Sequence, residues 1–296
     1  MSHSTGRSVA LVASIAILSW ASAYPVVRIA LRDMPPIPLA ALRYAIAAVL
    51  ALAWLAWTRP TPPRLSDIPQ FLASGAIGIT LYNILFNQGE VTVSSGAASL
   101  LISAAPLMAG VLATIFLGER MPAWGWIGSL LSFAGVAMIA QGQAGGLALG
   151  SGASLVFGAA VCGAVYTVLQ KGLVRRYGAL PTIAYILIVG AVLLAPWLPE
   201  ALSDYTRASC TSRFSVMELG IFPAAIGYAA WGAVIGRLGA ARGAIFLYLL
   251  PPVTMVLAFG LTGEVPTLRT LLGGAIVMAG VIMTNTLGRG SRVRTA

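Results

Sequence analysis

Charged residues and histidine are scarce in this chain. Asp, Glu, Lys and Arg form only 9% of the 296 residues, and His3 is the single histidine. Soluble domains carry about 25% charged residues, so the composition excludes an ordinary soluble domain. With one histidine and two cysteines, a Ser-His or Cys-His nucleophile and a His/Cys metal site are also excluded. We therefore expect no enzyme activity, no metal and no cofactor.

Hydrophobic residues take the place of the missing charge. They form 58% of the chain, and the mean hydropathy is +0.90. A helix needs about 20 apolar residues to cross a bilayer, and a helix satisfies its own backbone there. We predict an all-α integral membrane protein whose ten spans lie near residues 9–30, 37–57, 68–88, 94–116, 122–140, 152–171, 180–198, 214–235, 241–261 and 267–286.

The distribution of basic residues predicts the topology. The formal net charge is +10, but no basic block interleaved with aromatic residues indicates nucleic-acid binding. Most Lys and Arg residues fall on the side of the membrane that holds the N-terminus, so the positive-inside rule predicts cytoplasmic termini. We expect the lipid bilayer and a small-molecule substrate as partners. Small-residue faces serve internal packing and dimerisation alike, so they predict no particular oligomer.

The chain repeats itself at an offset of 145 residues. This offset aligns residues 106–138 with 251–283 and keeps eleven of 33 positions identical, including a proline, a Gly-Glu pair and an Ala-Gly-Val run. The Gly-rich stretch 141–152 separates the halves. We predict two five-helix repeats, 1–145 and 146–296. Because each has an odd number of spans, the second is inverted, as in transporters that work by alternating access.

Few ionisable groups are expected inside the spans. No Asp, Glu, Lys or His lies in the middle of any predicted span. An uncharged cavity suits neutral or zwitterionic solutes that move down their own gradient, and a proton carrier would have to be Glu90 or another helix end. The polar stretch 199–215, which has mixed charges, indicates a solvated outer loop.

Aromatic and amide side chains at membrane depth fall on shared helical faces. Members of each group lie three or four residues apart, and Tyr24/Tyr166 and Tyr82/Tyr228 are also repeat mates. The symmetry predicts a chamber for an amphipathic molecule, although packing between helices is the commoner role of any single such residue. The candidate substrate-binding residues are Trp20, Tyr24, Tyr82, Asn83, Tyr166, Gln170, Tyr228 and Trp231.

Three further polar residues are substrate-binding candidates. Arg43 is the one charge well within a predicted span, where it can receive a carboxylate or instead bind the carbonyl groups of a neighbouring helix. Ser99 and Tyr248 could supply hydroxyl groups. Hydroxyl groups in spans more often bond to their own helix, so the structural alternative stays open.

Prolines inside spans mark candidate hinges. Pro25, Pro106 and Pro251 each remove one backbone hydrogen bond of a helix, and Pro106 and Pro251 are repeat mates. A static kink explains them equally well, because neighbouring helices can satisfy the freed carbonyl groups.

Several motifs resemble one known family. These are the sequence SWASAYPVVR at 19–28, then Pro38 and ALRY at 41–44, the Leu-Gly-Glu motif at 117–119 before Pro122, and the Ala-Gly-Val run that closes each half. They resemble the EamA-type drug/metabolite transporter superfamily, most closely the aromatic amino acid exporter group. The resemblance implies ten helices in inverted repeats, export of small metabolites, and a family-typical Arg43 that fits a structural role as readily as a substrate contact.

The expected function follows from both kinds of evidence. The chain lacks the mid-helix lysines that suit phosphorylated sugars. We expect an exporter of neutral or zwitterionic metabolites, in particular aromatic or apolar amino acids, in a bacterial-type inner membrane. The alternatives are a broad exporter of lipophilic drugs or toxicants and, from another class, a membrane scaffold.

Overall fold

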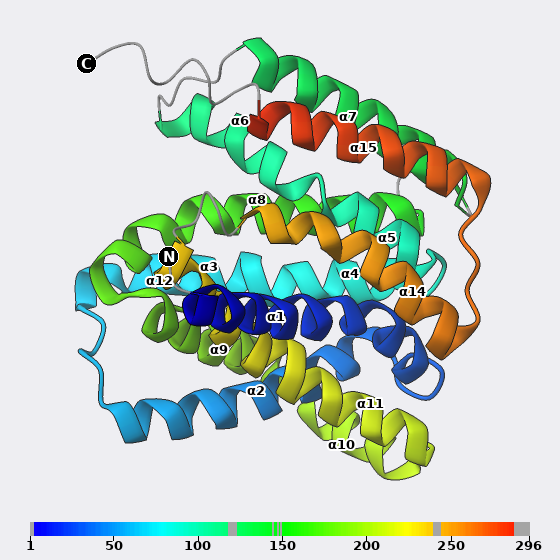
Figure 1. The fold of residues 1–296 in the computed structure, drawn as a ribbon. Helices are drawn as coiled ribbons and strands as arrows, with labels where there is room; N and C mark the ends of the chain where they lie inside the picture. Colours follow the sequence, from blue (N-terminus) through cyan, green and yellow to red (C-terminus); the bar gives the residue numbers. More distant parts are fainter. Residues whose placement is uncertain are drawn as a thin grey trace, which may run out of the picture.

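The computed structural model describes residues 3–117, 123–143, 145, 146, 148, 150–238 and 244–286, and these form helices without any strand (Figure 1). The α-helices are α1 (His3–Ala30), α2 (Pro36–Thr58), α3 (Ile68–Gly75), α4 (Tyr82–Glu90), α5 (Ser95–Ile102), α6 (Ala105–Leu117), α7 (Ala123–Gln141), α8 (Gly152–Tyr177), α9 (Ala179–Leu194), α10 (Leu198–Arg207), α11 (Cys210–Ile221), α12 (Gly227–Leu238), α14 (Leu250–Thr262) and α15 (Leu268–Thr286).

Short segments of other helix types join several of these α-helices. The π-helical segments Ala76–Leu81 and Phe222–Ile226 connect α3 to α4 and α11 to α12. The 3-10 segments are Leu65–Asp67, Ala195–Trp197 and Ala244–Leu249. Within the described residues, eight continuous helical segments are long and apolar enough to cross a membrane, and Leu250–Thr262 and Leu268–Thr284 are shorter apolar helices. The all-helical membrane class is thus confirmed, whereas the count of ten spans stays a prediction.

The stretch 199–215 is helical, so its interpretation as a solvated loop is wrong. It contains most of α10 and the start of α11. Ala201 and Ala208 are buried, whereas Glu200, Arg207 and Arg213 are exposed, so the stretch is amphipathic. The Ser209 hydroxyl accepts a hydrogen bond from the Ser212 amide at 3.2 Å and caps α11, which starts the helix four residues before the apolar pattern does.

The first helix of each half, α1 or α8, packs among helices of the other half. Helix α1 packs against α11, α12 and α14, while α8 packs against α4, α5 and α6. Since α1 and α8 are aligned by the sequence repeat, these two sets of contacts are reciprocal. The centre of the bundle is therefore surrounded by helices from both parts of the chain (Figure 1).

Helices α7 and α15 lie side by side and cross at paired glycines (Figure 1). A Cβ atom added to Gly135 would lie 2.6 Å from the Gly273 carbonyl oxygen, and one added to Gly280 would lie 2.4 Å from the Gly128 carbonyl oxygen. Only glycine permits this approach, which is typical of close helix pairs in lipid. Gly128 and Gly273 are repeat mates, as are Gly135 and Gly280, so each contact has a mirror contact.

A hydrogen bond lies at the centre of this crossing. The Ser132 hydroxyl donates to the Val277 carbonyl oxygen at 2.9 Å, and the two residues are 145 positions apart. Contacts between residues that are each other's repeat mates are expected on a two-fold axis. The arrangement of α7 and α15 has the reciprocity of such an axis.

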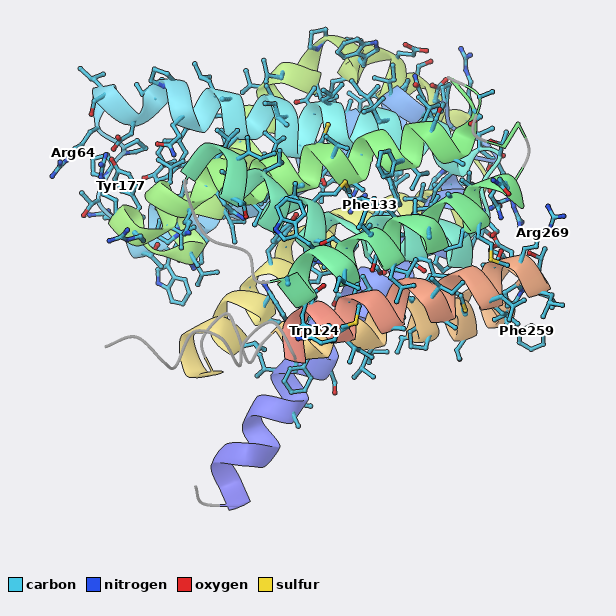
Figure 2. All side chains as sticks on the ribbon, turned by 90° about the horizontal axis from the view of Figure 1, so that it is seen from above. Arg64, Trp124, Phe133, Tyr177, Phe259 and Arg269 are labelled. Carbon is cyan, nitrogen blue, oxygen red and sulfur yellow. The ribbon has the colours of Figure 1, made fainter. Side chains whose placement is uncertain are left out.

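The two ends of the bundle are held by different polar contacts (Figure 2). We name them after residues labelled there, the Arg64 end and the Arg269 end. At the Arg64 end, Arg176 forms an ion pair with Asp67, and the Tyr177 hydroxyl donates a hydrogen bond to the same Asp67 carboxylate. At the Arg269 end, the Arg28 Nε lies 3.0 Å from an oxygen of Glu264.

Asp33 contributes to stability at the Arg269 end. Its Oδ2 accepts hydrogen bonds from the Ser209 amide at 3.0 Å and from the Ser212 hydroxyl at 2.7 Å. Hydrogen bonds from Ser209 and Ser212 hold the pKa of Asp33 below its usual range. A carboxylate with a lowered pKa stabilises the fold above its unfolded pKa of about 4, and this contribution is lost as the pH falls through the lowered value.

We expect Asp33→Asn to lower the thermal unfolding temperature of the purified protein at pH 7 by a small amount. The difference from the parent should shrink progressively as the pH falls below about 4, because the stabilisation by the parent carboxylate decreases from its unfolded pKa down through its lowered folded pKa. Glu200→Gln, at an exposed position of α10, is the control. A pH-independent difference would contradict the role of the Asp33 charge.

Candidate substrate-binding chamber

A cavity of about 280 Å³ lies at the centre of the bundle, between the two reciprocal helices α1 and α8. We call it the chamber. Its wall also includes α2, α4, α12 and both π-helical segments. Among the residues predicted from the sequence, those that line it are Trp20, Tyr24, Arg43, Tyr82, Tyr166 and Tyr228.

The aromatic rings of the wall contact one another across helices. Trp20 of α1 meets Tyr228 of α12 edge-on, with 5.5 Å between ring centroids. Phe86 stacks on Tyr82 at 5.8 Å and is met edge-on by Tyr24 at 5.4 Å. Such pairs add about 0.5–1.5 kcal/mol each beyond the burial of their area, so the wall is firmly positioned.

The two π-helical segments stand directly before the repeat-mate tyrosines. One ends at Leu81, next to Tyr82, and the other ends at Ile226, two residues before Tyr228. A π turn interrupts the regular i to i−4 bonding and is frequent at functional sites. Within the second, the Pro223 carbonyl accepts a hydrogen bond from Trp20 Nε1 at 3.1 Å. The sequence pattern, which assumes regular helices, gave no signal for these turns.

Glycines hold two of the large rings in place. A Cβ atom at Gly78 would lie 2.3 Å from the Tyr166 ring, and one at Gly227 would lie 2.8 Å from Trp20 Nε1. Both glycines belong to or adjoin a π-helical segment. The rings therefore pack directly on the backbone of the facing helix.

Arg43 is the only charged residue among those that line the chamber. Its guanidinium lies 5.2 Å from the centroid of the Tyr44 ring, and its Nη1 lies 3.4 Å from Asn83 Oδ1. The side chain is buried, and its Nε has no hydrogen-bond partner among the described residues. A buried guanidinium with a free donor is an available site for an anion.

Asn83 lies behind the wall of the chamber. Its amide nitrogen donates to the Tyr44 hydroxyl at 2.9 Å and to the Ile79 carbonyl oxygen at 2.8 Å. Together with its contact to Arg43, this makes Asn83 a positioning residue. Tyr44, which lines the chamber, was missed by the sequence analysis because it has no aromatic repeat mate: in this part of the repeat the offset is 143 residues, as for Pro38 and Pro181, and pairs it with Leu187.

Other candidates lie apart from the chamber wall. The Ser99 hydroxyl donates to the Gly96 carbonyl of its own helix at 2.8 Å, which is the structural alternative. Gln170 follows Tyr166 by one helical turn, roughly 6 Å toward the Arg64 end. Trp231 contacts Trp20, with 5.4 Å between centroids, but does not line the cavity. The side chain of Tyr248 lies outside the described residues, as does Glu119 of the repeated Gly-Glu pair.

The proline positions differ in local structure. Pro25 lies within α1, but Pro106 and Pro251 are the second residues of α6 and α14. A proline there removes no helical hydrogen bond, because the first amides of a helix have no partner. The helix breaks that precede them, rather than the prolines themselves, interrupt the two segments. Their role as hinges stays a prediction.

One carboxylate lies deeper in a membrane-length segment than the predicted span 214–235 placed it. Glu218 belongs to Cys210–Val234, about 12 Å along the helix from its start. Its Oε1 accepts a hydrogen bond from the Ser22 hydroxyl at 2.6 Å, and its Oε2 has no partner among the described residues. Glu90 at the end of α4 is also fully buried. The prediction of movement down the solute gradient rested on a lack of carboxylates at membrane depth. With Glu218 inside a membrane-length segment and Glu90 buried, that reason no longer applies.

Comparisons with known proteins agree with the predicted family. The model of the EamA-like transporter family matches residues 7–141 and again 150–286. A probable terminal-alkyne amino-acid exporter of Streptantibioticus cattleyicolor is 39% identical over 93% of this chain and 93% of its own length. A probable amino-acid metabolite efflux pump of Salmonella typhimurium is 26% identical over 93% of this chain and 94% of its own.

A solved structure supports the same fold. This crystal structure of a protein superimposes with a TM-score of 0.64 at 21% identity and covers 97% of this chain and 99% of its own. The helical, multi-pass architecture and the doubled family match thus agree, and the resemblance drawn from the sequence motifs is confirmed. The chain belongs to the EamA-like transporter family.

Proposed function

We propose that the protein exports small neutral or zwitterionic amino acids with aromatic or apolar side chains across a bacterial-type inner membrane. The observation that carries this is the chamber, an aromatic cavity with Arg43 as its one charge. Its volume of about 280 Å³ is near the lower end of the roughly 300–1,000 Å³ of small-molecule sites. The size favours a metabolite over a bulky drug.

The chamber offers a complementary group for each part of an amino acid. The Arg43 guanidinium suits a carboxylate, with which it can pair through two parallel hydrogen bonds. The faces of the tyrosine rings and Trp20 attract an ammonium group through cation–π interaction. Few contacts are charged, so we expect millimolar affinity, which corresponds to about −4 kcal/mol.

We propose further that two inverted halves, 1–145 and 146–296, open the chamber to each side in turn, with both termini cytoplasmic. The reciprocal contacts of α7 and α15 support the inversion. So does the packing of α1 and α8, each among helices of the other half, which brings Tyr24, Tyr82, Tyr166 and Tyr228 to the wall of one cavity. Rocking of one half against the other would change access to a site that they share.

The names of the relatives support the amino-acid cargo. Both the Streptantibioticus and the Salmonella proteins are described as probable exporters or efflux pumps of amino acids or their metabolites. The assay below separates amino-acid export from the alternative of broad toxicant export.

The test is counterflow of labelled amino acids into proteoliposomes that contain the purified protein. We expect uptake of phenylalanine and other apolar amino acids, and a loss of at least about tenfold in Tyr82→Ala and Tyr228→Ala, because each removes a ring from the wall. Both variants should reach the membrane in normal amount. Loss of flux at normal abundance would argue against a scaffold, because a scaffold does not need these two rings. Tyr205→Ala, on α10 and outside the chamber, is the control.

Two results would contradict the proposal. One is the absence of counterflow for every amino acid. The other is resistance of cells to lipophilic toxicants without any amino-acid flux, which would support the alternative exporter.

A further inference from the structure

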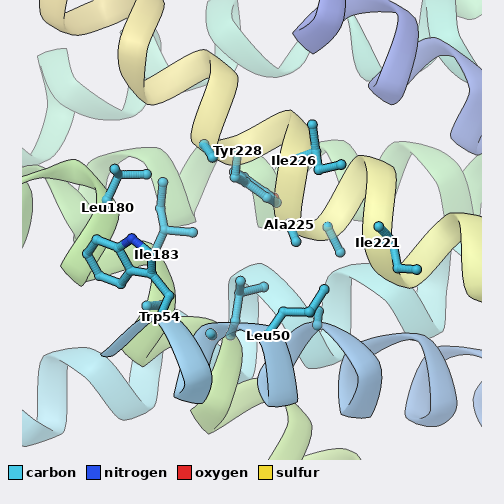
Figure 3. Close-up of a pocket in the computed structure, with 14 residues that line it drawn as sticks. Leu50, Trp54, Leu180, Ile183, Ile221, Ala225, Ile226 and Tyr228 are labelled. Atoms are coloured by element: carbon cyan, nitrogen blue, oxygen red, sulfur yellow. The ribbon is translucent and has the colours of Figure 1, made fainter. Parts of the chain in front are cut away.

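A second cavity, of about 400 Å³, lies between α2, α9 and the segment that joins α11 to α12. Figure 3 shows Leu50 and Trp54 of α2 facing Ala225, Ile226 and Tyr228, with Ile183 of α9 at the side. No charged residue lines it, and six of its 14 lining residues are alanine. We call it the alanine-lined cavity. Its space exists because these short side chains do not fill it.

The alanine-lined cavity adjoins the chamber. Tyr228 lines both, and the two cavities follow each other along one face of α2. Arg43 belongs to the chamber, while Ala47, one helical turn further, belongs to the alanine-lined cavity, and Trp54 closes its far side. Ala47 lies roughly 6 Å from Arg43 along the helix axis, a distance that the side chain of an amino acid spans.

We propose that the alanine-lined cavity is the subsite for the apolar side chain of the substrate, whose carboxylate is held by Arg43. This rests on the proposed function and specifies its substrate class: α-amino acids with a long apolar or an aromatic side chain. The shared wall at Tyr228 favours a substrate side chain as the occupant. Leu50 and Ile226, 39% and 37% exposed, form the rim, so a lipid tail is the competing occupant.

The subsite predicts a dependence of transport on side-chain length. Each methylene group that enters an apolar cavity gains about fourfold in binding. Between alanine and norleucine, which differ by three methylene groups, kcat/KM in proteoliposomes should rise by more than tenfold. Ala225→Phe fills the cavity from its wall and should reduce this ratio to about two or less.

A matched variant controls for the added ring. Ala53→Phe makes the same change on α2 at an exposed position that does not line either cavity, and it should keep the norleucine-to-alanine ratio of the parent protein. Equal kcat/KM values for alanine and norleucine in the parent would overturn the subsite and leave amino-acid export intact. No flux of either would instead refute the proposed function, and with it the subsite.

The response of the Ala225→Phe variant separates the two occupants. A selective loss for norleucine and phenylalanine supports the substrate side chain. An equal loss for alanine and norleucine overturns the proposal, and it is the result expected if a lipid tail fills the cavity to support helix packing. No loss for either amino acid overturns the proposal as well.

Discussion

Replacing Arg43 with glutamine is expected to lower amino-acid flux by at least about tenfold while folded protein still reaches the membrane. Hydrogen bonds to a charged group contribute about 1.5–3 kcal/mol, and a factor of ten corresponds to 1.4 kcal/mol. Arg43 is the only charge on the chamber wall, so no neighbouring group there can replace it. Glutamine preserves a polar donor near Asn83 but removes the charge and the planar fork.

Substrate analogues distinguish a contact with the carboxylate from a structural role. The parent should move phenylalanine much faster than phenylalanine amide, which has no carboxylate, whereas the Arg43→Gln variant should move both at similar low rates. Arg43→Lys keeps the charge without the fork and should retain intermediate flux. If Arg43→Gln lowered flux but left the acid-to-amide ratio unchanged, Arg43 would act by holding Tyr44 and Asn83 in place.

Gly135→Val is expected to remove most of the folded protein from the membrane. The first carbon of the new side chain would lie 2.6 Å from the Gly273 carbonyl oxygen and 2.8 Å from the Val277 amide nitrogen. Both are backbone atoms that cannot rotate away, so α7 and α15 must separate. Overpacking in a close-packed interior costs about 1–3 kcal/mol, and helix pairs in lipid have only packing and hydrogen bonds to offset it.

The measurement is the yield of monodisperse protein in detergent together with its unfolding temperature. Gly280→Val should have the same effect, because its added carbon would meet the Gly128 carbonyl oxygen at 2.4 Å. Gly260→Val is the matched control, since nothing lies within 4 Å of a carbon added there. A normal yield and unfolding temperature for Gly135→Val would show that α7 and α15 do not require this crossing.

The composition and the lengths of apolar sequence were sufficient to predict the all-helical membrane class, and the internal repeat predicted several residues of the chamber wall. Lengths of apolar sequence determine which helices can cross a bilayer, and repeat mates such as Tyr82 and Tyr228 line one cavity because the halves contact each other reciprocally. The fold class therefore follows from composition and pattern. The presence of repeat-mate tyrosines in one cavity wall was predicted from the symmetry of the repeat alone.

Other features depend on interactions that no pattern of apolar residues encodes. The depth of Glu218 in its helical segment depends on the cap at Ser209, which starts the helix within a polar stretch. The π turns before Tyr82 and Tyr228 change the register of the helix by local backbone choices that periodicity averages out. The Ser99 hydroxyl donates its hydrogen bond to the Gly96 carbonyl of its own helix and not to the chamber, because this acceptor lies within reach on the same helix.

The packing of α1 and α8, each among helices of the other half, affects how the protein assembles during biosynthesis. When the ribosome has delivered residues up to α7, α1 still lacks its neighbours α11, α12 and α14, and α4, α5 and α6 lack α8. Early helices must therefore wait in the bilayer with their contact faces open to lipid. The translocation path is completed only when late-emerging helices insert between those already present, so assembly of this transporter is expected to be largely post-insertional.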